Sequence, residues 1–330
     1  MRRILSDLNE RLAGQPLASA TLASFAAQWL ERKQGELERV SYDSYRGAVN
    51  GFVNATPAKA SMGIQYVTPG DIATYRDASA AKATPKTANN KLKILRTFFQ
   101  TAWRDGYIPD NPAAKVEALK SEESTRRPFT LPEIQKIIAA ANTEWRGMVL
   151  FGLYTGQRLK DVAALRWDSL DTTEKVLRLT TSKTGRFQEL PLARPLLAYL
   201  EELPALDDPT ASIFPAAAAL LEKDGDVARL SQQFFEILAS LKLVKERLGK
   251  DQSKGIGRSG KRERNVLSFH CLRHTATSLL KNAGVSESVA QDIIGHDTTE
   301  MSKHYSKIDL PAKRKAIAKL PDVTIGGKKK

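Results

Sequence analysis

The last quarter of the chain gathers side chains that could do chemistry on a phosphate. All four histidines lie between residues 269 and 305, together with the only cysteine, at His270, His274, His296, His304 and Cys271. Arg273 shares a helix face with His270, and Tyr305 closes the region. Arginine stays charged and can donate two hydrogen bonds to one phosphate, and tyrosine can act as a covalent nucleophile. These residue types suit attack on a phosphodiester.

Further side chains that could act on a phosphate lie earlier in the chain, between residues 153 and 191. Residues 153–161 have the sequence Leu-Tyr-Thr-Gly-Gln-Arg-Leu-Lys-Asp, which supplies Arg158 and Asp161. Residues 177–191 alternate apolar and polar side chains on both sides of a Lys-Thr-Gly turn, which predicts a β-hairpin with Lys183 at its tip. The two arginines would hold a phosphate from different sides, and the lysine could protonate a leaving oxygen.

The elements that must position these residues are predicted to be mainly helices. A capping box that begins at Thr130 starts a helix, and the nearly all-apolar residues 145–154 predict a core helix. A helix that starts near residue 270 carries His270 and Arg273, and a second from 287 to 294 ends at Gly295. With the hairpin, they predict a mainly α domain containing a small β-hairpin or sheet.

The first third of the chain is predicted to be a small all-helical bundle. Residues 22–29 repeat apolar side chains at helical spacing, and Ser41 is a candidate N-cap of a second helix. Thr68 and Thr84 each precede a proline that can open a further helix. The last of these helices has a broad apolar face and is predicted to end at Gly106.

A length of 330 residues predicts about two domains, each large enough to bury a core. A polar, charged segment without periodicity separates the two helical regions and is typical of a linker. The predicted order is a short arm, a helical domain, the linker, the domain that carries the chemistry and a basic tail, in residues 1–17, 18–115, 116–127, 128–321 and 322–330.

The composition favours a polyanionic partner. The net charge is +14 and the pI is about 9.7, so nucleic acid is the first expectation and an anionic membrane surface the second. The apolar runs are far shorter than the ~18 residues of a membrane span, and the N-terminus does not resemble a signal peptide. One cysteine cannot form an internal disulfide, which suits a reducing cytoplasm. The expected location is cytoplasmic, without a membrane partner.

In their order along the chain, these motifs resemble those of the tyrosine recombinases, the family of phage integrases and Xer-like DNA strand-exchange enzymes. The likeness covers residues 127–320 strongly and residues 20–115 as a general pattern. It implies a SAM-like helical core-binding domain that clamps DNA, followed by a catalytic domain. It also implies a site-specific recombinase that works through a 3′-phosphotyrosyl intermediate and a Holliday junction, without metal, ATP or another cofactor.

The resemblance assigns a role to each motif residue. The expected catalytic residues are Arg158, Lys183, His270, Arg273, His296 and Tyr305, with no metal ligands. Tyr305 would be the nucleophile, and the two arginines would hold the nonbridging oxygens. Lys183 would protonate the leaving 5′ oxygen. His270 would take the tyrosine proton or hold a nonbridging oxygen, and His296 would donate a further hydrogen bond. Asp161 would hold an arginine or a histidine in place.

The expected partners follow from the same family. They are a double-stranded recombination site, a homotetramer on two such sites, and accessory DNA-bending or directionality proteins. Two basic regions are candidate DNA contacts, one in the helical domain and one in the Gly-rich loop of residues 245–264, against the alternative of solvated surface. Their residues are Lys82, Lys86, Lys91, Lys93, Arg96, Arg258, Lys261, Arg262 and Arg264.

Three other functions would each use part of this pattern. His270 and His274 have the spacing of a zinc-binding helix, but no glutamate follows His270 and Arg273 would place a cation beside the metal. A DNA-binding protein without catalysis would need only the basic surface. A type IB topoisomerase would use the same tyrosine and arginine chemistry on one strand. His274 and His304 are expected to make fold contacts or face solvent, and Cys271 to be a small buried residue.

The C-terminal segment also carries an expectation. Pro311 can start a helix in which Ala316, Ile317 and Leu320 form a narrow apolar stripe. Such a stripe must be buried against something. The family resemblance suggests docking on a neighbouring protomer, and the simpler alternative is packing on its own domain.

Overall fold

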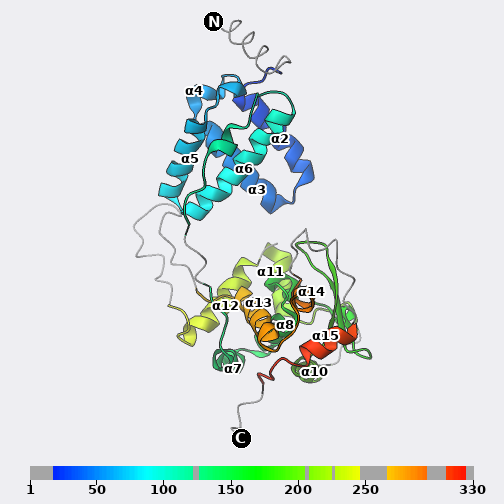
Figure 1. Cartoon of the computed structure of the whole chain (residues 1–330). Helices are drawn as coiled ribbons and strands as arrows, with labels where there is room; N and C mark the ends of the chain where they lie inside the picture. Colours follow the sequence, from blue (N-terminus) through cyan, green and yellow to red (C-terminus); the bar gives the residue numbers. More distant parts are fainter. Residues whose placement is uncertain are drawn as a thin grey trace, which may run out of the picture. The chain divides into compact units, whose positions relative to one another are not determined.

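The computed structural model describes residues 18–121, 126–204, 208–224, 227–245, 266–295 and 310–324. The chain divides near residue 124 into two compact units, and each has its own hydrophobic core. We call them the N-terminal unit (described residues 18–121) and the C-terminal unit (described residues from 126 onward). Figure 1 shows helices in both units and a small sheet in the second. The predicted mainly helical fold is confirmed, whereas the finer domain boundaries stay a prediction.

The N-terminal unit is built from helices. They are α2 (Leu22–Glu36), α3 (Arg39–Ala55), α4 (Pro57–Ala60), α5 (Pro69–Lys82) and α6 (Pro85–Arg104), with 3₁₀ turns at Ile64–Tyr66 and Pro112–Lys115. Its core is rich in aromatic rings that meet edge to face. The Phe98 ring, for example, lies 5.2 Å from the rings of both Phe25 and Trp29.

Local sequence explains most of the helix starts in this unit. The side chain of Thr68 accepts a hydrogen bond from the Asp71 N–H, and Thr84 caps α6 in the same way. The prediction that Ser41 caps the second helix was wrong, because α3 already begins at Arg39 and its N-cap makes no side-chain hydrogen bond. Tyr42, in the first turn of α3, is partly buried against the core of this unit.

The C-terminal unit combines helices with one antiparallel sheet. Its helices are α7 (Leu131–Ala140), α8 (Thr143–Thr155), α9 (Leu159–Ala163), α10 (Arg194–Glu201), α11 (Pro215–Asp224), α12 (Ala228–Ser240), α13 (His270–Asn282), α14 (Glu287–Ile294) and α15 (Leu310–Ile317). A 3₁₀ turn spans Trp167–Ser169, and the strands are β1 (Leu170–Asp171), β2 (Val176–Thr180) and β3 (Phe187–Pro191), in the order β1-β2-β3. The predicted hairpin is β2–β3, and the two-residue β1 is too short to be recognised from alternation.

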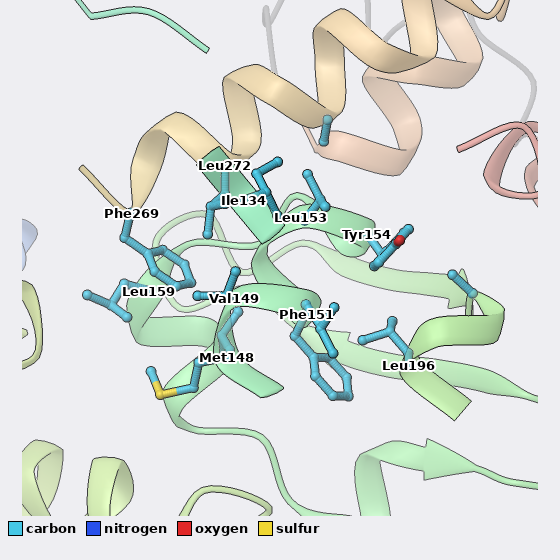
Figure 2. Close-up of a cluster of buried hydrophobic side chains, with 14 of the residues drawn as sticks. Ile134, Met148, Val149, Phe151, Leu153, Tyr154, Leu159, Leu196, Phe269 and Leu272 are labelled. Carbon is cyan, nitrogen blue, oxygen red and sulfur yellow. The ribbon is translucent and has the colours of Figure 1, made fainter. Parts of the chain in front are cut away.

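Helix α8 is the centre of this unit, as its apolar sequence predicts, and nearly all of its residues are buried. Figure 2 shows Val149 and Leu153 of α8 in the same cluster as Phe269 and Leu272 from the start of α13. Gly152 makes this contact close, because a Cβ at that position would lie 2.7 Å from Cζ of Phe269. The glycine thereby lets the helix that carries His270 and Arg273 approach α8.

The C-terminal helix packs on its own unit. Ala316 and Ile317 of α15 are each 4% exposed and belong to the hydrophobic core of the C-terminal unit. Lys313 is buried as well, and its Nζ donates to the backbone oxygen of Glu189 on β3 at 3.0 Å. The prediction that the apolar stripe docks on a neighbouring protomer was therefore wrong, because the same domain already covers it.

None of the helices in the described ranges combines the length and the apolar character that a membrane span needs.

Candidate active site

The site begins where α8 ends and α9 begins. Gly156 ends α8 with a left-handed backbone (φ +64°), and a Cβ there would lie 2.4 Å from Cδ1 of Ile294 at the end of α14. Arg158 follows as the extended N-cap residue of α9, with its side chain about a quarter exposed. The glycine thus brings the ends of two helices together and turns the chain so that Arg158 reaches the surface.

Arg273 holds this junction from α13. It is 3% exposed, and its guanidinium donates to the Gly156 backbone oxygen at 2.8 Å and to the Gly295 backbone oxygen at 2.7 Å. Gly295 ends α14 and precedes His296 in the chain. A single buried cation therefore orders the backbone beside Arg158 and the backbone that leads to His296.

His270 and His274 lie one turn apart on the same face of α13. Their ring centroids are 5.0 Å apart, with the rings nearly perpendicular, and both residues keep more than a third of their surface exposed. Burial of part of the ring, aided by nearby positive charge, lowers the pKa of His270 to about 4. That charge comes from His274, Arg273, Arg126 and Arg158. A neutral imidazole at neutral pH can accept a proton.

Arg126 is a member of this basic group that the sequence motifs did not indicate. With His270 and Ser268 it lines a cavity of about 300 Å³ whose other walls include Phe234 and Leu238. Its charge, after burial, lowers the pKa of His274 as well. His274 was expected to have no role beyond the fold, but it lies against His270 on this positively charged surface. The only available signal in the sequence was proximity to a motif.

Lys183 lies at the tip of the β2–β3 hairpin, as predicted, and is exposed. The turn is closed by backbone hydrogen bonds from Thr181 N–H to the Arg186 oxygen (2.9 Å) and from Gly185 N–H to the Thr181 oxygen (2.9 Å). Gly185 has φ +63°, which explains the Lys-Thr-Gly sequence. The backbone of the tip is therefore defined, while the lysine side chain extends into solvent.

Asp161 connects the lysine turn to Arg158. It is 5% exposed, its Oδ1 accepts from the Ser182 N–H at 2.8 Å, and its Oδ2 lies 4.0 Å from the Arg158 guanidinium. That Oδ2 has no hydrogen-bond partner among the described residues. The sequence suggested that Asp161 holds an arginine or a histidine. In the structure it lies near Arg158 and also holds the residue before Lys183.

Two buried glutamines complete the connection between these elements. Gln157 donates from Nε2 to Oε1 of Gln188 on β3 at 2.9 Å, and Gln188 donates to the backbone oxygens of Asp292 (3.1 Å) and Ile293 (3.4 Å) on α14. Sequence reasoning missed this pair. One signal was available, because Gln188 occupies an inward-facing position of a strand where an apolar residue is normal.

The described part of the site therefore brings together Arg158, His270 and Arg273, with the Lys183 turn tied to them through Asp161. His296 and Tyr305 lie outside the described residues, and so do the predicted DNA contacts Arg258, Lys261, Arg262 and Arg264.

The predicted DNA-contact residues of the N-terminal unit differ in their surroundings. Lys82, Lys86 and Lys93 are exposed. Lys91 is half-buried with its ammonium 5.4 Å from the centre of the Tyr75 ring. The Arg96 guanidinium donates to the backbone oxygens of Ala113 (3.3 Å) and Val116 (2.5 Å) and so holds the segment that follows α6. DNA binding by these residues stays a prediction.

Metal-binding residue types do not cluster within the described ranges, where no group of three or more His, Cys, Asp or Glu side chains could hold an ion. Cys271 is fully buried, as expected.

Comparison with known proteins shows similarity over much of the chain. Residues 128–310, more than half of the sequence, match the Phage integrase family. The tyrosine recombinase XerC of Alcanivorax borkumensis is 27% identical over 278 residues, which cover 79% of this chain and 83% of that protein.

Two solved structures share the fold. A lambda integrase fragment in a dimer bound to a COC′ core site aligns with a TM-score of 0.64 at 20% identity, covering 88% of this chain and 99% of the fragment. A lambda integrase tetramer bound to a Holliday junction aligns with a TM-score of 0.58 at 20% identity, covering 88% and 81%.

Proposed function

This chain belongs to the phage integrase family and is a tyrosine-type site-specific DNA recombinase, and we propose that it cuts and rejoins DNA through a 3′-phosphotyrosyl intermediate formed by Tyr305. The observation that carries this proposal is the grouping of Arg158, His270 and Arg273 around the junction of α8, α13 and α14. Each has the chemistry that a phosphodiester requires, and they come from segments more than 100 residues apart.

The proposed reaction assigns one task to each group. The Tyr305 oxygen attacks the scissile phosphorus and forms a phosphotyrosyl bond, while its proton passes to His270. The bond between phosphorus and the 5′ oxygen breaks, and that oxygen takes a proton from the Lys183 ammonium. Arg158 and Arg273 hold the nonbridging oxygens as negative charge develops. His296 donates a further hydrogen bond. Because the ester keeps the bond energy, a 5′ hydroxyl from another strand can reverse the step.

The proposed assembly is a homotetramer on two double-stranded recombination sites that exchanges strands through a Holliday junction. The lambda integrase tetramer, which shares the fold, supports this arrangement. Accessory DNA-bending or directionality proteins, a mobile-element role and a cytoplasmic location belong to the same proposal. Among the predicted DNA contacts of the N-terminal unit, Lys82, Lys86 and Lys93 are exposed, so their ammonium groups are free to reach phosphates.

A Tyr305→Phe variant tests the nucleophile. Wild-type protein mixed with a library of nicked duplexes should give a covalent protein-DNA adduct that survives denaturation, and the variant should give none while it binds the same DNA. Sequencing the DNA of the wild-type adduct would identify the site. An adduct that persists in the variant would assign the nucleophile elsewhere, and supercoil relaxation without exchange between paired sites would favour a topoisomerase.

Cleavage should also proceed without a metal ion, because two arginines and a lysine supply the positive charge that Mg²⁺ would bring. EDTA should leave the rate of adduct formation unchanged. A loss of activity in EDTA that Zn²⁺ or Mg²⁺ restores would contradict the assignment.

A further inference from the structure

We propose that Asp292 is a positioning residue for Lys183, and that together with Asp161 it clamps the turn that carries this lysine. The inference rests on the proposed function, in which Lys183 protonates the leaving 5′ oxygen. Asp292 lies on α14, more than 100 residues from the hairpin, and no sequence motif indicates it.

Asp161 holds the side of the turn that enters from β2. Its Oδ1 accepts from the Ser182 N–H at 2.8 Å, directly before Lys183, and the carboxylate is almost completely buried. A buried carboxylate that accepts from a backbone N–H fixes that peptide more firmly than solvent would. The residue before the lysine therefore has one well-defined position.

Asp292 holds the side that leaves toward β3. Its Oδ1 is hydrogen-bonded to Nη2 of Arg186, which ends the turn three residues after Lys183. The backbone oxygen of the same residue accepts from Nε2 of Gln188 at 3.1 Å. The side chain and the backbone of one residue thus hold two positions of the hairpin, Arg186 and Gln188.

A second cation lies on the other side of the Asp292 carboxylate. Its Oδ2 lies 2.8 Å from Nζ of Lys313 on α15, and that lysine side chain is only 7% exposed, against 19% for Asp292 and 31% for Arg186. Lys313 Nζ also donates to the Glu189 backbone oxygen on β3. An ion triad with this little exposure is screened weakly by solvent, so it restrains the three elements more than a surface pair would.

This arrangement matters because the lysine side chain itself is exposed and flexible. Lys183 has four rotatable bonds and extends into solvent, so the only way to aim its ammonium is to fix the backbone beneath it. Proton transfer needs the ammonium within hydrogen-bond distance of the 5′ oxygen, and a misplacement of about 1 Å can cost roughly 100-fold in rate. The two carboxylates therefore act through the turn on the protonation step.

The test uses a substrate that does not need the proton. In a duplex with sulfur in place of the bridging 5′ oxygen at the mapped cleavage position, the leaving thiolate departs unprotonated. With the ordinary duplex at saturating concentration, Asp292→Asn and Arg186→Gln should slow single-turnover cleavage by about 10- to 100-fold. This is less than the full rate enhancement that a general acid provides, because Lys183 is still present but less well positioned. With the sulfur duplex both variants should cleave within about threefold of wild type, as should Lys183→Ala.

Matched variants separate positioning from stability. Asp171→Asn breaks the ion pair to Arg178 (2.7 Å), which joins β1 to β2 away from the turn, and should leave both rates unchanged. Because Asp292→Asn leaves the buried Lys313 without its carboxylate, the neutral double variant Asp292→Asn/Lys313→Gln guards against unfolding and should show the same selective rescue. A defect of equal size on both substrates would overturn the proposal, as would unchanged cleavage of the ordinary duplex.

Amide hydrogen exchange tests whether Asp161 and Asp292 hold the Lys183 turn, and it requires neither DNA nor enzymatic activity. Amides of residues 182–187 should exchange at least several-fold faster in Asp292→Asn and Arg186→Gln than in wild type, and at the wild-type rate in Asp171→Asn. Unchanged exchange in the turn would overturn the proposal. If wild-type protein formed no adduct with any DNA, the proposed function would fail, and hydrogen exchange would still decide whether Asp292 holds the turn.

Discussion

The two arginines of the site contribute the same charge from different surroundings. Arg158 is partly exposed and lies 4.0 Å from a buried carboxylate, whereas Arg273 is buried and donates to two backbone oxygens. Arg158 is therefore the more accessible of the two arginines and has few structural contacts, while Arg273 has a structural role beside the catalytic one that we propose for it.

Replacement by alanine should separate these roles. Arg158→Ala and Arg273→Ala should each raise the barrier for cleavage by about 3 kcal/mol, the scale of one lost transition-state donor. Only Arg273→Ala should also lower the free energy of unfolding, by about 1–3 kcal/mol, because it leaves two carbonyl groups without a partner. Single-turnover cleavage and urea denaturation measure the two effects. Equal stability of both variants would contradict the structural role of Arg273.

The pH dependence of stability should report His270. Its pKa lies near 4 in the folded protein, below the 6.5 of the unfolded chain, so the unfolded state binds more protons between these values. Stability should therefore be lost as pH falls from about 6.5 to about 4, and His270→Gln should flatten part of this slope. The partial exposure of the ring keeps the effect small. Urea denaturation at a series of pH values measures it, and a slope unchanged by the substitution would contradict the lowered pKa.

At the scale of elements, α15 belongs to the core of the C-terminal unit. It contributes Ala316 and Ile317, and the chain beyond it is held by Tyr154, whose hydroxyl donates to the Pro321 oxygen at 2.8 Å and accepts from the Val323 N–H at 3.2 Å. Burial raises the pKa of Tyr154 to about 12. The phenol is therefore protonated throughout the useful pH range and keeps both hydrogen bonds.

Truncation should show this structural role. Deleting residues 310–330 exposes core side chains and leaves the partly buried Asp292 without Lys313, so the unfolding temperature of the C-terminal unit should fall by several degrees or more. Deleting only residues 325–330 removes no residue of that core and should leave the temperature unchanged. Differential scanning calorimetry compares the two, and equal stability would mean that α15 is dispensable for the fold.

The whole molecule carries a net charge of +14, and its predicted DNA contacts occur in two separate stretches of the sequence, residues 82–96 and 258–264. If six phosphates are neutralised, the logarithm of the binding constant should fall with the logarithm of salt concentration with a slope of about −5. Fluorescence anisotropy with a duplex of fixed sequence measures the slope. A flat dependence would mean that the charge serves something other than DNA.

Variants of two residues of α6, Lys93 and Arg96, should separate DNA binding from stability in this measurement. Lys93 is exposed, so Lys93→Gln should make the slope shallower by about 0.9 without a change in stability. Arg96 holds backbone carbonyl groups, so Arg96→Gln should lower the free energy of unfolding of the N-terminal unit. A shallower slope for the arginine variant as well would add DNA contact to its structural role.

The sequence by itself was enough to predict the features that depend on neighbouring residues. Helix starts at Thr68, Thr84 and Thr130 follow from a side chain that caps a backbone N–H three residues later, and the Lys-Thr-Gly turn follows from the left-handed backbone of Gly185. The burial of helix α8 could also be predicted, because a helix that is apolar on all sides is stable in water only inside a hydrophobic core. The candidate catalytic residues could also be named from the sequence, because the proposed chemistry requires their residue types, and their roles stay a prediction.

Tertiary structure decided the contacts between segments that are far apart in the chain. Gln157 meets Gln188 across 31 residues, Arg186 meets Asp292 across 106, and Lys313 meets the Glu189 oxygen across 124. The burial of α15 on its own domain, and the grouping of Arg126 with His270, depend on the same long-range packing. No local pattern encodes such pairs, because the residues on either side of a charged or amide side chain do not show whether it faces solvent or a buried partner. Only the folded chain determines whether such a side chain contacts solvent or another side chain.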